Sequence, residues 1–215
     1  MIKTMIKFYL AFGLLMIGAT GVSAQDSSDR AVDDPDEAME FIQDLARKTE
    51  SVWDDTTLTG DERYDQFRHL FEEATDTKII AVAMLGSHYR RITTAQRKEY
   101  TEAITDYIIS EFDRRMTQFG YQRLEIVGTT PAPGKRGHLY VRTEVIRDEG
   151  DPIVVDWRVR KKKGKLQIIN LEVQGINLVV TNRELFRSRI KAVGIDGLIG
   201  ELREDSISDA GSAAE

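Results

Sequence analysis

The spacing of apolar residues changes once along the chain, near Gly120. Before this residue, apolar side chains recur every three or four positions, and after it they alternate with polar ones. The first spacing is that of one face of an α-helix, and the second is that of a half-buried β-strand. The pattern therefore predicts helices in the N-terminal part of the chain and strands after them.

Capping signals separate the first two predicted helices. Asp34 can cap a helix whose first residue is Pro35, and Phe41, Ile42, Leu45, Ala46, Val52 and Trp53 then follow at helical spacing. Thr59 and Glu62 have the spacing of a capping box before a second helix. The apolar stripe behind that box consists of Tyr64, Phe67, Leu70 and Phe71.

Two further helices precede the change of period. The first covers roughly residues 77–85, and its run "IIAVAML" is apolar nearly all round, so we expect it to be buried. Thr93 and Gln96 open a longer helix, which ends before Gly120. An apolar stripe from Tyr100 to Phe119 runs along this helix.

The alternating part predicts a meander of about four antiparallel strands. "RDEGDP" and "KKKGK" supply hairpin turns between alternating runs, and Leu166 to Val173 forms the last strand. Helices that precede strands, rather than alternating with them, favour an α+β fold. One face of the sheet is apolar and the other is charged, which indicates that helices cover one side only.

The first 24 residues are typical of a secretory signal peptide. Lys3 and Lys7 precede an apolar segment over residues 8–19, and residues 22–24 form a small-residue cleavage site. An uncleaved anchor is the alternative, but the apolar run is shorter than the ~20 residues that a membrane-spanning helix needs. No cysteine follows the cleavage site, which excludes a lipoprotein anchor. We therefore expect an exported protein.

Cleavage would remove 24 of the 215 residues and leave 191, enough for one domain with a sizeable core. We expect a flexible leader over 25–34, one domain over 35–203 and a disordered, acidic tail over 204–215. Losing the two lysines of the signal moves the net charge from -6 to -8. This acidic balance argues against a nucleic-acid partner, and the absence of cysteine excludes disulfides and thiolate metal sites.

Catalytic and metal-binding signatures are missing from the sequence. His69, His88 and His138 lack the spacing of a metal site, and the chain has no GxSxG motif and no thiol nucleophile. The acidic residues fall on helix faces and in turns, where capping and solvation explain them. We therefore expect neither enzymatic activity nor a cofactor.

Two clusters of basic residues stand out on this acidic chain. One is the run from Arg160 through Lys161 and Lys162 to Lys165, and the other is Arg90 with Arg91. Each has two interpretations: a solvated surface, or a contact with anionic lipid headgroups or an acidic partner, at ~1 kcal/mol per charge near such a surface.

The joint after the last predicted strand is unusually apolar. Gly175 ends the strand, Ile176, Leu178, Val179 and Val180 follow, and Thr181 with Glu184 predicts a helix start near Asn182. Joints of this kind are usually polar and exposed. Ordinary core closure is one explanation for this joint, and the wall of an apolar cavity between sheet and helices is the other.

The segment "VQGINLVVTNRELFRSRIKAVGIDGLIGEL" resembles the C-terminal motif of the MlaC family of periplasmic lipid-binding proteins, auxiliary components of an ABC transporter. The family pattern, Glu/Gln-Gly-x-Ser/Asn-Leu and then Gly-x-Asp-Gly-Leu, matches 174–178 and 194–198. Upstream, "LGSHYRRITTAQRKEY" is similar to the family's Gly-x-x-aromatic-Arg followed by Thr-x-x-Gln. Tyr89 stands where the family more often has Trp, and Asn177 where Ser is usual.

The resemblance covers roughly residues 35–203. It implies a helical layer on a curved antiparallel sheet, C-terminal helices, and an apolar cavity between the layers for the acyl chains of a phospholipid. Members shuttle lipid between an outer-membrane lipoprotein complex and an inner-membrane ABC transporter with a ring-forming lipid-binding subunit, which maintains outer-membrane lipid asymmetry. Relatives also suggest a hopanoid as an alternative cargo. A periplasmic monomer is the expectation for such a shuttle.

The apolar face of the sheet and the helical stripes opposite it supply the predicted lipid-binding residues. From the sheet and the joint these are Val141, Val145, Val155, Trp157, Leu171, Val173, Ile176, Leu178 and Val179. From the helices they are Phe67, Phe71, Ile80, Met84, Tyr107, Ile108 and Phe112. The predicted headgroup or partner contacts are Arg90, Arg91, Arg160, Lys161 and Lys162.

Overall fold

The computed structural model describes residues 32, 34–118, 121–134, 137–147 and 149–210. The expected signal peptide and most of the expected leader lie outside these residues. The helical part consists of α1 (Pro35–Asp54), α2 (Gly60–Ala74), α3 (Thr77–Leu85), the 3₁₀ helix η1 (Gly86–Arg90) and α4 (Thr94–Gln118).

Side-chain caps fix the starts of these helices. The Asp34 carboxylate accepts from the N–H of Asp36 at 2.9 Å, with Pro35 as the first helical residue. Thr59 and Glu62 form the predicted capping box of α2. Each cap satisfies N–H groups that have no partner within the helix, which explains why the predicted boundaries agree with the structure.

The strands are β1 (Tyr121–Pro131), β2 (Leu139–Arg147), β3 (Ile153–Lys162), β4 (Lys165–Val173) and β5 (Ile176–Asn177). They form one antiparallel sheet in the order β1-β2-β3-β4-β5, and the sheet is not closed into a barrel. The α+β class is confirmed. The predicted count of about four strands omitted β5, a two-residue strand that pairs with the end of β4.

The last element, α5 (Leu178–Ala210), starts four residues before the predicted start at Asn182. The Asn177 side-chain oxygen accepts from the N–H of Val180 at 3.0 Å, so Asn177 caps the helix in place of Thr181. At Gly194, φ is 76° and the helix kinks into two arms. The second arm continues past residue 203, the expected end of the domain.

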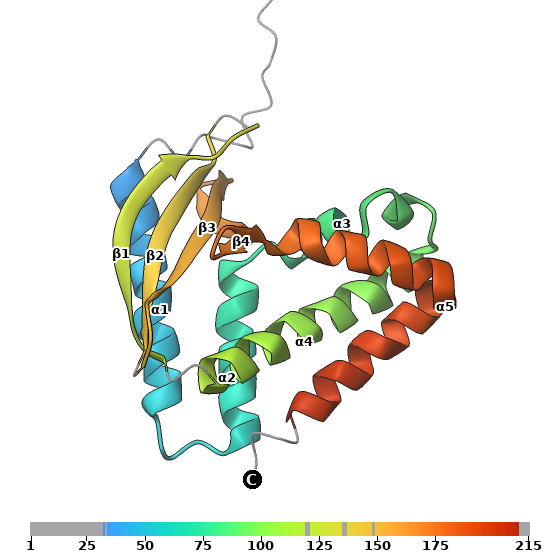
Figure 1. Cartoon of the computed structure of the whole chain (residues 1–215), viewed down its shortest axis with the longest axis horizontal. Coiled ribbons are helices and arrows are strands. Elements are labelled where there is room, and N and C mark those ends of the chain that lie inside the picture. The colour runs from blue at the N-terminus through green and yellow to red at the C-terminus, as the bar shows by residue number, and fades with distance from the viewer. Residues whose placement is uncertain (1–31, 33, 119–120, 135–136, 148, 211–215) are drawn as a thin grey trace, which may run out of the picture.

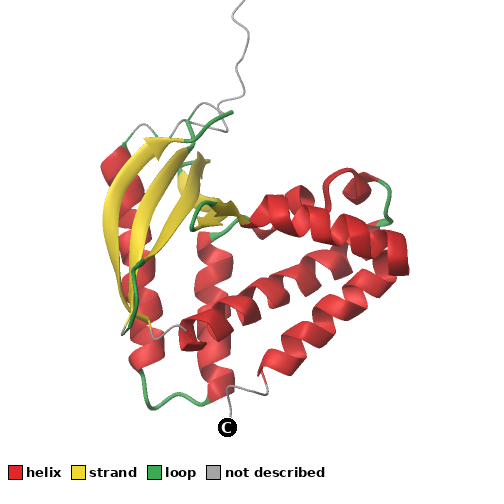
Figure 2. Cartoon of the chain, in the orientation of Figure 1, coloured by secondary structure: helices red, strands yellow, loops and turns green. Residues whose placement is uncertain are grey.

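The elements form two bodies with separate cores (Figures 1 and 2). In the first, α1 lies behind the sheet, and Ala38 and Ile42 pack against Val141, Val159 and Ile168. In the second, α3, α4 and both arms of α5 enclose a core that includes the fully buried Tyr100 and Ile104, together with Phe186 and Leu198. The joint between β4 and α5 connects the two bodies.

The described part of the expected leader contributes to the first core. Val32 is buried, and its N–H donates to the carbonyl of Gly137 at 2.9 Å. This residue is therefore held against the sheet. Across the described residues, no helix combines the length and apolar character needed to cross a membrane.

Candidate functional site

Strand pairing places the sheet residues predicted to bind lipid on one face. Val141 lies opposite Trp157, which lies opposite Leu171 on the next strand, and Val155 lies opposite Val173. Val145 lies on the same face, opposite Ile153. Side chains directly opposite each other in a sheet share a face, so the six predicted sheet residues, together with Ile153, form one apolar surface.

Helix α1 covers only part of this apolar face. Val141 is fully buried against α1, and Val155 is also buried. Val145, Ile153, Leu171 and Val173 are only half-buried. The free end of the apolar face therefore has room for further apolar contacts.

The polar groups of this surface are satisfied internally. The Trp157 indole N–H donates to the Thr143 hydroxyl at 2.9 Å, and that hydroxyl donates to the Val155 carbonyl at 3.2 Å. Thr143 itself is fully buried. A cargo lying against this wall would meet carbon atoms and leave no buried donor or acceptor unpaired.

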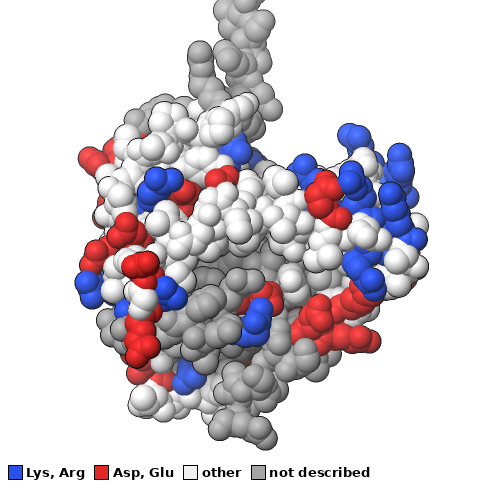
Figure 3. Space-filling model, in the orientation of Figure 1, with Lys and Arg blue, Asp and Glu red and all other residues white. Residues whose placement is uncertain are grey.

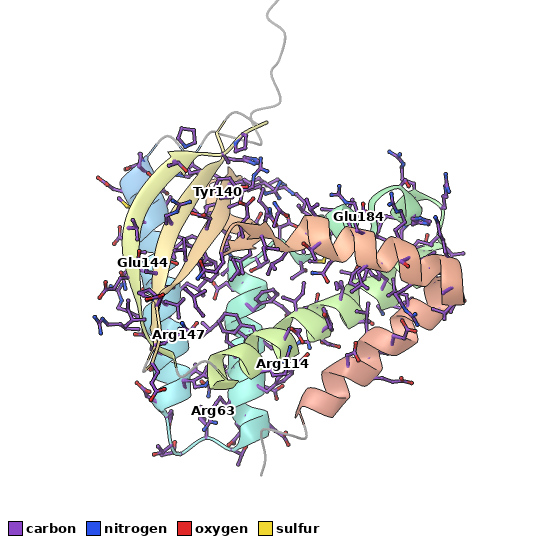
Figure 4. All side chains as sticks on the ribbon, in the orientation of Figure 1. Arg63, Arg114, Tyr140, Glu144, Arg147 and Glu184 are labelled. Carbon is purple, nitrogen blue, oxygen red and sulfur yellow. The ribbon has the colours of Figure 1, made fainter. Side chains whose placement is uncertain are left out.

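The opposite face of the sheet is polar, as predicted. The Tyr140 hydroxyl donates to Glu172 at 2.7 Å, and Arg142 pairs with Asp156 through two hydrogen bonds of 2.8 Å. Burial raises the pKa of Tyr140, and the hydrogen bond to Glu172 raises it further. Tyr140 and Glu144 are labelled on β2 in Figure 4. This face is held by its own network and offers no apolar wall.

An aromatic stack forms part of the helical side of the site. The rings of Phe67 on α2 and Phe112 on α4 stack at 4.8 Å between centroids, and Trp53 on α1 packs edge-on against Phe67 at 5.4 Å. Phe67 is buried, while Phe112 and Phe71 are half-buried. The stack joins three helices and leaves Phe112 partly uncovered.

The remaining helical predictions divide into two groups. Ile80 and Met84 lie inside the core of the second body, where helices already cover them. Tyr107 and Ile108 are half-buried and pack on the edge of that core. The first pair is therefore fully covered by protein, whereas the second pair is only partly covered.

The residues of the apolar joint also fall into a buried and an exposed group. Val179 is buried in the helical core and Leu178 is half-buried, but Ile176 is 57% exposed. The turn at Gln174 and Gly175, with φ of 50° and 77°, turns the chain from β4 into β5. The joint is therefore partly core closure and partly a free apolar edge beside the half-buried end of the sheet.

We take as the candidate site the half-buried apolar residues at the edges of the two cores, on the apolar face of the sheet and on the helices. Phe67 and Val155 are buried but belong to neither core cluster. Figure 3 shows the surface hollowed between the sheet and the α4–α5 arm. The half-buried residues of the site are Phe71, Tyr107, Ile108, Phe112, Val145, Ile153, Trp157, Leu171, Val173 and Leu178.

The predicted lipid-binding residues did not include two residues that contribute to the candidate site. Ile153 shares the apolar face with Val145, and Trp53 buttresses Phe67. The alternation of apolar residues in β3 includes Ile153, and the apolar stripe of α1 includes Trp53. These patterns could not say which apolar positions the helices cover.

Two grooves lie elsewhere, along α1 and α2. One has a volume of about 470 Å³ and is lined by Val52 and Leu70 with Lys48, Asp65 and His69 among its polar residues. The other, of about 340 Å³, extends from Leu70 toward the β3–β4 turn. Charged side chains border both grooves, with Lys48 shared by the two, whereas the walls between the bodies are formed by apolar side chains, so we place the lipid at those walls.

The predicted cations fall into two classes. Arg160 is buried and pairs with Asp76, Lys161 pairs with Glu37 at 2.6 Å, and Lys162 lies 3.8 Å from Asp76. These contacts tie the β3–β4 hairpin to α1 and α3, so Arg160 is not presented on the surface. Arg90 and Arg91 are exposed at the end of η1.

The described residues contain no group of histidine and carboxylate side chains arranged to hold a metal ion.

Further cations border the lower end of the molecule, where Figure 4 labels Arg63 on α2, Arg114 on α4 and Arg147 on β2. Arg147 donates to the Asp151 carbonyl, and Arg114 pairs with Glu111 at 2.6 Å.

Comparison with known proteins gives matches of two kinds, to a family model and to solved structures. A family model described as "MlaC protein" matches residues 42–204. A solved structure of a phospholipid-binding protein from Ralstonia solanacearum, in complex with a phospholipid, is similar with a TM-score of 0.66. Its sequence is 17% identical, and the match covers 82% of this chain and 98% of the other. The second match shows a shared fold.

Proposed function

Because the chain belongs to the MlaC family, we propose that it is an exported, periplasmic phospholipid carrier. The observation that carries this proposal is the pair of apolar, half-buried walls between the sheet and the helices. The similar protein from Ralstonia solanacearum was solved with a phospholipid bound, which supports a phospholipid as the cargo.

The energetics of lipid transfer explain the architecture. Each methylene group withdrawn from water contributes ~0.8 kcal/mol, so a free diacyl phospholipid cannot cross an aqueous gap at a useful rate. A carrier needs apolar walls for the chains, an opening for the headgroup and an affinity weak enough for release. Leu171 and Phe112 supply such walls, and the site needs no catalytic group.

In this proposal the protein takes lipid from one membrane system and gives it to another. The donor or acceptor partners are an outer-membrane lipoprotein complex and an inner-membrane ABC transporter with a ring-forming lipid-binding subunit. Such exchange would maintain lipid asymmetry of the outer membrane. A monomer that binds one phospholipid, without a cofactor, suits this role because the shuttle must dissociate from both partners.

The test is lipid content and uptake. The mature protein, purified without detergent, is expected to carry diacyl phospholipid in native mass spectrometry and to extract labelled phospholipid from vesicles. A hopanoid in the extract would support the carrier function but identify a different cargo. A protein that is empty and extracts nothing would refute the proposal.

Leu178→Arg tests the site itself. A charge placed on the apolar wall must lose its hydration when acyl chains arrive, so lipid uptake should fall at least about tenfold. Leu171→Arg repeats the test from the sheet side. Val127→Arg is the matched control, because Val127 is 55% exposed and lies outside the site. Circular dichroism confirms folding, and normal uptake by both folded site variants would place the lipid elsewhere.

A further inference from the structure

Outside the β3–β4 hairpin, positive charge is concentrated in two segments of this acidic chain. Residues 77–98 contain five basic residues and no acidic one, and residues 176–193 contain four basic residues and one acidic one. The whole chain has a net charge of -6. The two segments therefore oppose the charge of the rest of the molecule.

The fold brings these two segments together. Helices α3 and α5 pack side by side in the second body, and the Arg183 guanidinium donates to the Ala83 carbonyl at 2.7 Å. Figure 3 shows Lys and Arg side chains gathered at the upper right, over the end of the molecule that α3, η1 and α5 form. We call this surface the basic face and define it by Lys78, Arg90, Arg91, Arg183, Arg187 and Lys191.

Most cations of the basic face have no carboxylate partner. Within the described part of the chain, Lys78, Arg90, Arg91 and Lys191 make no ion pair, and all four are exposed. Arg187 pairs only with Glu184, one turn earlier on α5. Two hairpin cations differ, because Arg160 is bound to Asp76 and Lys161 to Glu37. The basic face therefore keeps charge available for an external anionic surface.

Exposed aliphatic side chains lie among these cations. Val82 is 38% exposed and one helical turn from Lys78, and Val180 is 50% exposed on the same side of α5 as Arg187 and Lys191. Cations interspersed with aliphatic side chains on helices are the composition that binds at the headgroup layer of a membrane. An acidic partner protein would satisfy the cations but would not require this mixture.

The basic face also adjoins the candidate site. The apolar joint leads directly into α5, so Leu178 in the site and the exposed Val180 are only two residues apart. A bilayer lying on the basic face would thus meet the edge of the site at the joint. This arrangement would let an acyl chain move between membrane and carrier along an apolar path.

We propose that the basic face docks on the surface of a phospholipid bilayer that contains anionic headgroups, with the joint at residues 176–180 turned toward the membrane. The inference rests on the proposed carrier function and adds the surface through which the carrier meets lipid. It assigns Arg90 and Arg91 to headgroups and leaves the hairpin cations a structural role.

Vesicle flotation of the mature protein tests this proposal. The wild type is expected to float with phosphatidylcholine vesicles that contain about a third phosphatidylglycerol, to remain behind with pure phosphatidylcholine, and to dissociate as salt screens the charges. Arg90→Gln/Arg91→Gln should weaken partitioning about thirty-fold, because each cation contributes roughly a fivefold factor near an anionic surface.

The matched control is Arg47→Gln/Lys48→Gln, which removes the same charge from exposed residues that pair with Asp44 on α1. It should change partitioning by less than about threefold. Equal losses in both double variants would overturn the proposal, since net charge rather than the basic face would then control binding. So would a wild type that ignores anionic vesicles, a result that would leave an acidic protein as the occupant.

Native mass spectrometry of the same samples separates this proposal from the proposed function. A wild type that carries phospholipid but never floats overturns docking and leaves the carrier function intact. A protein that floats but neither carries nor extracts phospholipid overturns the carrier function and leaves membrane docking supported. Val180→Ser, which keeps every charge, should weaken flotation without loss of bound lipid.

Discussion

The ion pair between Asp76 and Arg160 holds the two bodies together. Arg160 lies on β3 and is only 4% exposed, and Asp76 immediately precedes α3. The Asp76 carboxylate also accepts from the N–H of Ile79 at 2.9 Å, and the N–H of Asp76 donates to Ile168 on β4. One side chain therefore caps a helix of the second body and neutralises a buried cation of the first.

Asp76→Asn separates these two roles, because asparagine caps helices as well as aspartate does. Removing one partner of a buried ion pair costs about 3–5 kcal/mol, since the remaining charge stays buried. Gln167 also accepts from Arg160 at 3.2 Å, so we expect the lower end, about 3 kcal/mol. Asp76→Ala also removes the cap and should cost about 1 kcal/mol more.

Urea denaturation followed by circular dichroism measures these differences at constant m-value. Asp44→Asn is the control, because that carboxylate pairs with Arg47 and Lys48 on the surface and should cost less than about 1 kcal/mol. In the double variant Asp76→Asn/Arg160→Met, most of the loss should disappear. A single Asp76→Asn variant as stable as the control would refute the idea that the pair is buried and coupled.

Three further predictions concern stability. Tyr100→Phe should raise the free energy of unfolding by about 1 kcal/mol, because the Tyr100 hydroxyl is buried without a hydrogen-bond partner among the described residues; a loss in denaturation experiments would contradict this. Gly194→Ala should cost about 1–2 kcal/mol, because φ is 76° at the kink of α5, and a neutral result would mean that the kink relaxes. Hydrogen bonds from the backbone N–H and then the hydroxyl of Thr59 lower the pKa of Glu62 below its ordinary 4.5. The capping box therefore stabilises the fold above that pH and loses this contribution as pH falls through the lowered pKa. The stability difference between wild type and Glu62→Ala should shrink from about pH 6 to pH 3, and a constant difference would exclude the linkage.

The parts of the fold that depend on neighbouring residues could be predicted from the sequence. The capping box of Thr59 and Glu62 and the alternation in β2 and β3 act over a few positions, so the pattern contains the whole interaction. The start of α5 was misplaced because two caps compete locally. Asn177 forms the hydrogen bond that Thr181 was expected to form, and spacing does not rank them.

Interactions between distant residues were beyond such reasoning. Arg160 was interpreted as a surface cation because its partner, Asp76, is 84 positions away in sequence. Ile80, Met84 and Val179 are as apolar as Leu171 and lie on predicted inward faces, but in the structure helices bury the first three. Periodicity shows which side chains share a face, but not whether another element or a cargo covers them. The assignment of individual residues to lipid stays a prediction.

A crystal structure of the protein with its copurified lipid tests the central claim most directly. The account predicts acyl chains between β3–β4 and α2–α4, in contact with Leu171 and Phe112, and a headgroup at the open edge. Acyl chains lying instead in the groove between α1 and α2, beside Val52 and Leu70, would contradict it.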